Sequence, residues 1–268
     1  MLVQNWVPSV EGMTQRLQDR TALVTGSTSN IGRAIAQRLA AEGAHVVVSG
    51  RDAERGEAVV AGIRADGGKA DFVRADLDGS REASHALAAE ATEVLGGRID
   101  VLVNNAGIYR TAPTLADTDA DALDQLYAVN VKAPYFLTQA VAPRMVADGG
   151  GAIVNLGSWV ARLAAPSGGA YASTKAAMES LTRSWAAELG AQGVRVNAVS
   201  PGVVRPPELD PALSFSENMT VGTPAGAPGH PDAIAAAVAY LASDDARFVH
   251  GSVLDVDGGR ANVAVVAA

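Results

Sequence analysis

Short runs of consecutive apolar residues alternate along this chain with longer segments whose apolar residues recur at helical spacing. Consecutive apolar residues predict strands that are buried on both faces, whereas the longer amphipathic segments predict helices. The predicted strands are Thr21–Thr25, Ala44–Ser49, Ala70–Ala75, Ile99–Asn104, Ala152–Leu156, Val194–Val199 and Val253–Val256. The predicted helices are Ile31–Glu42, Ala53–Ala65, Ser80–Leu95, Asp121–Ala147 and Ala170–Leu189.

Strands that alternate with helices predict right-handed βαβ units and a parallel sheet. We therefore expect an α/β fold of the doubly wound type, with about seven parallel strands and helices on both faces. Since no linker divides the chain, residues 17–268 are predicted to form a single domain behind an N-terminal arm at residues 1–16. Pro134 and Pro143 predict irregularities in the longest helix. Residues 201–231 are rich in proline and glycine, which predicts a mobile substrate loop.

The composition narrows the possible functions. The chain has no cysteine, so disulfides, thiol catalysis and thiolate metal sites are excluded. Its formal net charge of −8 argues against nucleic acid or an anionic membrane surface as a partner. The four histidines show no paired spacing, so no metal site is predicted. The first residues lack the pattern of a signal peptide and no apolar stretch is long enough to span a membrane, so we expect a cytoplasmic protein.

A tyrosine and a lysine one helical turn apart form the most informative motif. Tyr171 and Lys175 are four residues apart in a predicted helix and project from the same face, and Ser158 lies thirteen residues upstream of the tyrosine. An ammonium beside a phenol is expected to lower the pKa of the phenol. The trio therefore predicts proton transfer to a carbonyl oxygen, although a packing tyrosine beside a solvated lysine would show the same spacing.

The first βα unit carries a glycine-rich turn. Its sequence from Thr25 to Gly32 is TGSTSNIG, and a helix follows at once. A strand, a glycine-rich turn and a helix N-terminus together bind phosphates through free N–H groups and the helix dipole. Asn30 stands where a further glycine would be expected, and asparagine tolerates the positive φ that such a turn requires. The alternative is an ordinary βα turn, but the position in the first unit favours a dinucleotide.

The end of the second strand bears on the choice of dinucleotide. An acidic residue there binds the ribose 2′-hydroxyl of NAD, whereas an arginine accommodates the 2′-phosphate of NADP. This strand ends in Ser49-Gly50-Arg51, which favours NADP(H) while leaving NAD(H) possible. Asp52 could pair with Arg51 and weaken that preference, and Arg51 could instead cap or solvate the next helix.

In their order, these motifs resemble those of the short-chain dehydrogenase/reductase family, from about Leu17 to Gly259. Thr25–Gly32 is similar to the family's cofactor turn, and the other matching positions follow along the chain. They are Asp76 in the segment ADL, the NNAG segment Asn104-Asn105-Ala106-Gly107, Asn130, Ser158, Tyr171, Lys175, Pro201-Gly202 and the VDGG segment ending at Gly259. The resemblance implies a Rossmann fold and an NAD(P)(H)-dependent oxidoreductase that interconverts a carbonyl and a secondary alcohol by hydride transfer.

The resemblance also implies roles for individual residues. The catalytic residues are expected to be Asn130, Ser158, Tyr171 and Lys175, with Tyr171 as acid and base, Ser158 holding the substrate oxygen and Asn130 fixing a water. Lys175 is expected to bind the nicotinamide ribose and to lower the pKa of Tyr171. The expected cofactor contacts are Gly26, Ser27, Ser29, Asn30, Ile31, Gly32, Arg51, Asp76, Leu77, Asn104, Ala106, Gly107, Tyr171, Lys175, Pro201, Gly202 and Val204. The expected substrate contacts are Ser158, Trp159, Tyr171 and Val203, and further apolar pocket candidates are Tyr109, Leu209, Leu213, Phe215 and Met219.

Two departures from the family pattern concern the substrate loop. Pro206 stands where the family often has a threonine that contacts the nicotinamide carboxamide, and Ala227 replaces a basic residue. The carboxamide is therefore expected to rely on backbone groups near Val204.

The resemblance leaves the substrate open. It is compatible with a 3-oxoacyl-ACP reductase-like activity, with reduction of other ketones, and with a sugar or polyol dehydrogenase of the glucose or gluconate type, and the sequence does not choose among them. A dinucleotide-sensing protein without turnover, or a structural protein, would keep the same fold. The helix from Ala170 is dense in small residues, which permit close helix packing. Because family members pair this helix across subunits, the resemblance implies a homotetramer.

Overall fold

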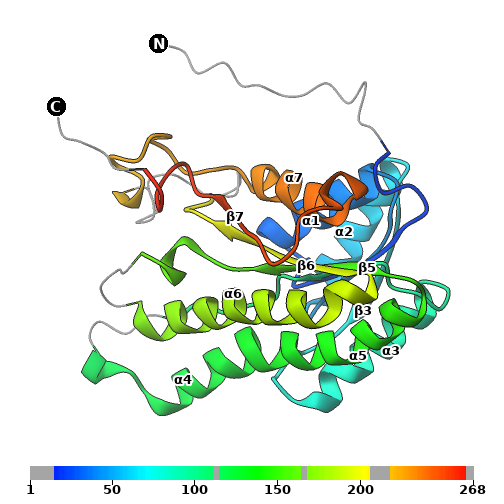
Figure 1. Cartoon of the computed structure of the whole chain (residues 1–268), viewed down its shortest axis with the longest axis horizontal. Helices are drawn as coiled ribbons and strands as arrows, with labels where there is room; N and C mark the ends of the chain where they lie inside the picture. The colour runs from blue at the N-terminus through cyan, green and yellow to red at the C-terminus, as the bar shows by residue number, and fades with distance from the viewer. Residues whose placement is uncertain (1–14, 111–114, 164–167, 206–217, 264–268) are drawn as a thin grey trace, which may run out of the picture.

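A seven-stranded parallel sheet forms the centre of the molecule (Figure 1). The computed structural model describes residues 15–110, 115–163, 168–205 and 218–263. The strand order is β3-β2-β1-β4-β5-β6-β7, and every pair of neighbours is parallel. The strands are β1 (Thr21–Thr25), β2 (His45–Gly50), β3 (Lys69–Arg74), β4 (Val101–Asn104), β5 (Gly151–Leu156), β6 (Val194–Pro201) and β7 (Val253–Val256). The predicted α/β class and parallel sheet are confirmed.

Helices cover both faces of the sheet, as Figure 1 shows. One face packs against α1 (Asn30–Ala41), α2 (Ala53–Ala65) and α7 (Pro231–Ala242). The other packs against α3 (Arg81–Val94), α5 (Ala133–Ala147) and α6 (Gly169–Leu189), with α4 (Ala120–Tyr127) leading into α5. Two apolar cores result, one on each face, because the side chains of each central strand alternate between the two helical layers. Among the described helices, none has both the length and the apolar character needed to cross a bilayer.

The strand order reverses between β1 and β4. From β1 the chain moves outward through β2 to β3, then returns to add β4 on the other side of β1. At such a switch point the loops after the two strands diverge and leave a crevice at their carboxyl ends, where open α/β sheets bind ligands. The glycine-rich turn follows β1 and the NNAG segment follows β4, so both motifs border this crevice.

The longest predicted helix is interrupted. Residues Asp121–Ala147 divide into α4, a π-helical turn at Ala128–Lys132 and α5. The irregularity predicted at Pro134 is present: the π turn ends two residues before it, and proline has no N–H to donate to the carbonyl of Asn130, four residues earlier. Pro143 lies inside α5, which continues past it to Ala147. The π turn contains the buried Asn130, and such turns are frequent at functional sites.

Helix α7 was not among the predicted helices. Pro231 begins it, a position that favours proline, and its buried face repeats at helical spacing through Ile234, Val238 and Leu241. The guanidinium of Arg195 on β6 donates to carbonyls at the end of this helix, 2.6 Å to Leu241 and up to 3.3 Å to residues beyond it. The helical spacing of these apolar residues could have predicted α7, but the helix was missed because it directly follows the proline-rich stretch.

Candidate active site

A cavity of about 460 Å³ lies at the switch point, above the glycine-rich turn. Helix α1 begins there with no acidic residue in its first turn, and the side chain of its N-cap Ser29 makes no capping hydrogen bond. The first N–H groups of the helix and its dipole are thus free to bind an anion, which fits the diphosphate of a dinucleotide. The lining includes Gly26, Thr28, Ser29, Asn30, Ile31, Gly32, Arg51, Asp76, Leu77, Asn105, Ala106 and Gly107.

The glycine-rich turn has the backbone geometry that the sequence predicts. Asn30 has φ of +46°, so asparagine does adopt the left-handed conformation at the position where glycine was expected. Gly32 could carry no side chain, because a Cβ atom there would lie 2.2 Å from the carbonyl oxygen of Gly26. The departure from the family motif therefore leaves the turn intact.

Arg51 and Asp76 face each other across the rim of this cavity. The Nε atom of Arg51 lies 3.9 Å from Oδ1 of Asp76, and 71% and 64% of the two side chains are exposed. Asp52 does not pair with Arg51: its carboxylate caps α2 and accepts hydrogen bonds from the backbone N–H and Nε of Arg55, at 3.0 and 2.7 Å. Asp52, which could have paired with Arg51, therefore binds Arg55, and Arg51 lines the cavity.

Two of the expected cofactor contacts, Ser27 and Asn104, line neither this cavity nor the catalytic cavity that adjoins it. Ser27 is fully buried, donating to the carbonyl of Val24 at 2.6 Å, so it braces the turn from within. The amide of Asn104 donates to Asn155 at 2.9 Å and to Thr138 at 3.2 Å, which places it on the face of the sheet that α5 covers. Because alternate residues of a strand face opposite sides, the neighbouring Asn105 lines the cavity instead.

Asn105 belongs to the NNAG motif but was not among the predicted cofactor contacts. Its amide donates to the carbonyl oxygens of Thr25 and Gly26 at 2.8 and 3.0 Å, which ties the end of β4 to the glycine-rich turn. The alternation of side chains along a strand could have identified Asn105, because two consecutive asparagines face opposite sides of the sheet.

A second cavity, of about 250 Å³, adjoins the first and contains the predicted catalytic trio. Tyr171 and Lys175 reach it from successive turns of α6, and Ser158 reaches it from the 3₁₀ turn Trp159–Ala161 that follows β5. Ile31, Asn105, Gly107, Ile108 and Tyr171 line both cavities, so the two form one continuous crevice. Pro201, Gly202 and Val204 from the end of β6 complete the wall.

The environment of Tyr171 differs from the expected one. Burial raises the pKa of Tyr171 to about 12, and the hydrogen bond with Ser158 lowers it only in part, while Tyr109 raises it further. Lys175 does not lower it: its Nζ lies 5.8 Å from the centre of the phenol ring and donates to the carbonyl of Leu156 at 2.9 Å. The expected depression of the phenol pKa is therefore wrong for this structure, because desolvation outweighs the distant ammonium.

Lys175 is itself affected by burial. Removal from water lowers the pKa of Lys175 to about 8. Near neutral pH the pair consists of a protonated phenol and an ammonium. This arrangement provides a proton donor at the cavity, which is the state required to protonate a carbonyl oxygen.

Asn130 lies beside the trio, and its side chain forms hydrogen bonds with other residues of the protein. Its Oδ1 accepts from the N–H of Ile108 at 2.8 Å, and its Nδ2 donates to the carbonyl of Ile108 at 3.0 Å and to Thr174 at 3.1 Å. The side chain thus braces the segment after β4 against α6. The expected bound water remains a prediction.

The expected substrate contacts divide between two places. Tyr109 lines the catalytic cavity, with its ring edge-on to Tyr171 at 4.9 Å between centroids. Trp159 is buried beneath Arg260, whose guanidinium lies 4.9 Å from the ring centroid, so Trp159 does not line that cavity. The candidates Leu209, Leu213 and Phe215 lie outside the described residues.

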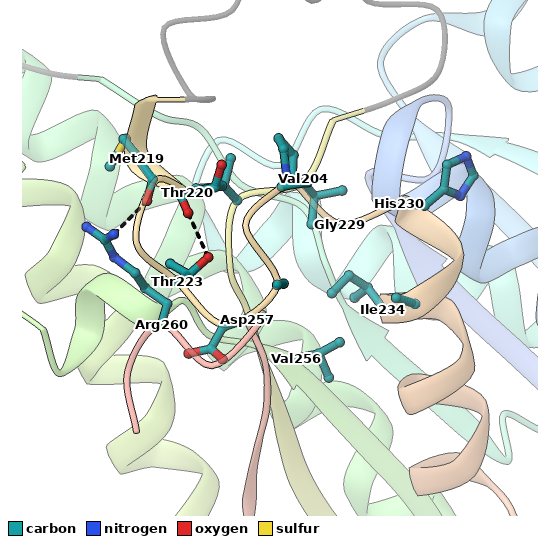
Figure 2. A pocket seen from close by; sticks show the side chains of 16 residues that line it. Val204, Met219, Thr220, Thr223, Gly229, His230, Ile234, Val256, Asp257 and Arg260 are labelled. Atoms are coloured by element: carbon teal, nitrogen blue, oxygen red, sulfur yellow. Dashed lines mark hydrogen bonds between the residues drawn. The ribbon is translucent and has the colours of Figure 1, made fainter. Parts of the chain in front are cut away.

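Val203 and Met219 line a further cavity of about 290 Å³, behind the segment that follows β6 (Figure 2). Val204 lies between this cavity and the catalytic one, because it lines both. The guanidinium of Arg260 donates to the carbonyl of Met219 at 2.6 Å, as the dashed line in Figure 2 shows. The walls are otherwise largely apolar, so apolar surface adjoins the catalytic cavity as the sequence analysis expected.

Known proteins similar to this chain are oxidoreductases. A family model described as enoyl-(acyl carrier protein) reductase matches residues 26–261. D-threitol dehydrogenase of Mycolicibacterium smegmatis is 38% identical over 91% of this chain and 94% of its own length. Gluconate 5-dehydrogenase of Gluconobacter oxydans is 37% identical over 91% of this chain and 95% of its own length. A solved structure of a short chain dehydrogenase/reductase family protein is 48% identical and superimposes with a TM-score of 0.83, covering 92% of this chain and all of that chain.

Proposed function

The chain belongs to the short-chain dehydrogenase/reductase family, and from this premise we propose how its crevice works. The protein is an NAD(P)-dependent oxidoreductase that interconverts a carbonyl and a secondary alcohol. The observation that carries the proposal is the convergence of Ser158, Tyr171 and Lys175 on a cavity continuous with the phosphate-binding turn.

A bound nicotinamide supplies or accepts the hydride. In the reducing direction the phenol of Tyr171 gives its proton to the carbonyl oxygen of the substrate, and the hydroxyl of Ser158 donates a hydrogen bond to the same oxygen. The raised pKa of Tyr171 supports this role, because it keeps the phenol protonated near neutral pH. Lys175 binds the nicotinamide ribose, and Asn130 positions the backbone of Ile108 beside the reacting groups.

NADP(H) is the proposed cofactor, with NAD(H) as the weaker one. Arg51 stands at the end of β2 on the rim of the cofactor cavity, where a 2′-phosphate would meet its guanidinium. Asp52, which could have neutralised it, is occupied by Arg55. The residues proposed to hold the diphosphate are those of the turn from Gly26 to Gly32.

The substrate is proposed to be a ketone with an apolar body, of the 3-oxoacyl type. The apolar surface of the cavity behind Val204 and the family model named for an acyl carrier protein reductase support this reading. A polyol or sugar acid is the second candidate, supported by the relatives that act on threitol and gluconate.

A panel of substrates tests the proposal. Acetoacetyl thioester and cyclohexanone are assayed with NADPH and NADH, and threitol and gluconate with NADP⁺ and NAD⁺, following absorbance of the reduced nicotinamide. We expect the fastest turnover with acetoacetyl thioester and NADPH. Faster turnover of gluconate or threitol would replace the substrate proposal, and no turnover of any pair would contradict the catalytic one.

A homotetramer in the cytoplasm is proposed for the assembled protein. The support is the small-residue face of α6, which would permit close packing against a second copy. Light scattering at micromolar concentration is expected to give four times the mass of the 27.3 kDa chain, and a monomeric mass would contradict the assembly.

A further inference from the structure

An ion pair between a buried carboxylate and a partly exposed guanidinium lies directly behind the turn that carries Ser158. Glu179 follows Lys175 by one turn of α6, so it extends the stripe formed by Tyr171 and Lys175. It is only 3% exposed, which is unusual for a carboxylate. Its Oε2 lies 3.4 Å from Nε of Arg162, the residue that ends the 3₁₀ turn Trp159–Ala161.

The same carboxylate touches the start of that turn. A Cβ atom at Gly157 would lie 2.9 Å from Oε1 of Glu179, so the carboxylate rests against the backbone just before Ser158. The backbone N–H of Ser158 also acts on it, since that interaction lowers the pKa of Glu179 against the rise caused by burial. Within the described residues, Oε1 has no full hydrogen-bond partner. Glu179 therefore contacts the turn at both of its ends.

Arg162 connects Glu179 to β6 and β7, the two strands at one edge of the sheet. Its guanidinium binds both carboxylate oxygens of Asp255 on β7 and donates to Oγ of Ser200 near the end of β6, at 3.3 Å. The 3₁₀ turn is thus anchored to α6, β6 and β7 by one side chain. These contacts add to the backbone hydrogen bonds of the turn itself, in which the N–H of Ala161 donates to the carbonyl of Ser158 at 2.9 Å and the N–H of Arg162 to that of Trp159 at 3.3 Å.

We propose that Glu179 and Arg162 are positioning residues that hold the hydroxyl of Ser158 in register with Tyr171 and Lys175. The proposal rests on the proposed function, because it assigns to the pair the placement of a catalytic hydroxyl. Burying the carboxylate of Glu179 costs solvation energy, so its ion pair is weak evidence for a contribution to stability. Its place beside Ser158, whose side chain it does not contact, fits a positioning role better. Misplacement of a reacting group by about 1 Å can cost about a hundredfold in rate.

The test compares Glu179→Gln with wild type, using the fastest substrate of the panel. Glutamine keeps the size of the side chain but removes the charge that pairs with Arg162, which Asp255 and Ser200 continue to bind. We expect kcat to fall by tenfold or more, while the Kd of NADPH, measured by fluorescence, stays within about twofold because the cofactor turn is untouched. Asp148→Asn, which removes the exposed ion pair with Arg144 on α5, is the matched control and should leave kcat unchanged.

A double-variant cycle shows whether Glu179 acts through Ser158. If it does, Ser158→Ala/Glu179→Gln should be no slower than Ser158→Ala alone. Multiplied losses would instead indicate a general structural effect and overturn the proposal. Should Glu179→Gln fail to fold, Arg162→Gln takes its place in the cycle with the same criteria, and Arg162→Lys should recover part of the rate.

The two proposals fail in different ways. If the wild type turns over no substrate, the proposed function is wrong and the positioning role is wrong with it. If the wild type is active, Ser158→Ala is slow and Glu179→Gln retains the full kcat, only the positioning role is overturned.

Discussion

The cofactor rim and the catalytic cavity share a wall, but they expose their charged groups very differently. Arg51 and Asp76 on the rim keep 71% and 64% of their side chains in contact with solvent. Lys175 and Glu179 behind the catalytic cavity are 6% and 3% exposed. Water and salt screen the charges of the rim, whereas those behind the cavity are screened much less. Changes in the cavity should therefore have large effects on turnover and stability, and changes at the rim small effects on binding.

The largest effect is expected from Tyr171→Phe. The variant keeps the buried ring, and its edge-on contact with Tyr109, but loses the only proton that we assign to the substrate oxygen. General acid catalysis contributes about 10² to 10⁴ in rate, so kcat should fall by that range while the Kd of NADPH changes little. Single-turnover and binding measurements separate the two quantities. A variant with near wild-type kcat would show that Tyr171 is not the acid.

Lys175→Met tests whether burial sets the chemistry of the cavity. In the unfolded chain this lysine has its ordinary pKa of 10.5, and in the folded protein a pKa of about 8. Between these values the unfolded chain holds a proton that the folded one lacks, so stability rises with pH across this window. Below pH 8 the buried ammonium costs about 3 kcal/mol. Because the pKa of Tyr171 is raised to about 12, the phenol reduces stability only above pH 10.

Denaturant unfolding at pH 7.5 and 9.5 measures this difference. The stability of the wild type relative to Lys175→Met should rise by about 2 kcal/mol between the two values. Lys69→Met, on the exposed edge of β3, serves as control and should keep the wild-type dependence on pH. Identical pH dependence in wild type and Lys175→Met would mean that Lys175 is solvated in the folded protein.

The same contrast decides what the sequence could predict. Strands buried on both faces have consecutive apolar residues, and this pattern located β1, β2, β4, β5 and β6. The edge strands β3 and β7 were also predicted, although they are less buried. The turn at Asn30 follows from a local backbone requirement, which the residue type itself satisfies at φ of +46°. These features depend on neighbours in the sequence, and local physical rules were sufficient for them.

Features that depend on tertiary packing were missed. Spacing places Lys175 beside Tyr171, but the Nζ of Lys175 donates to the carbonyl of Leu156 at the end of β5. The raised pKa of Tyr171 reflects burial by segments distant in the sequence. The side chain of Asn130 likewise forms hydrogen bonds with Ile108 and Thr174, which are distant in the sequence. No local pattern encodes these contacts, so motif matching located the residues without predicting their electrostatic states.

The smallest effect is expected at the rim, from Arg51→Ala. An exposed guanidinium that binds a 2′-phosphate contributes modestly because solvent screens it, so the Kd of NADPH should rise about tenfold and that of NADH hardly at all. Raising the salt concentration should shrink the loss, which no buried contact would do. Asp76→Asn is the matched control: it changes the other member of the 3.9 Å pair, which we expect to meet the adenine common to both cofactors. It should therefore alter the two Kd values by equal factors, and equal losses in Arg51→Ala would remove Arg51 as the reader of the 2′-phosphate.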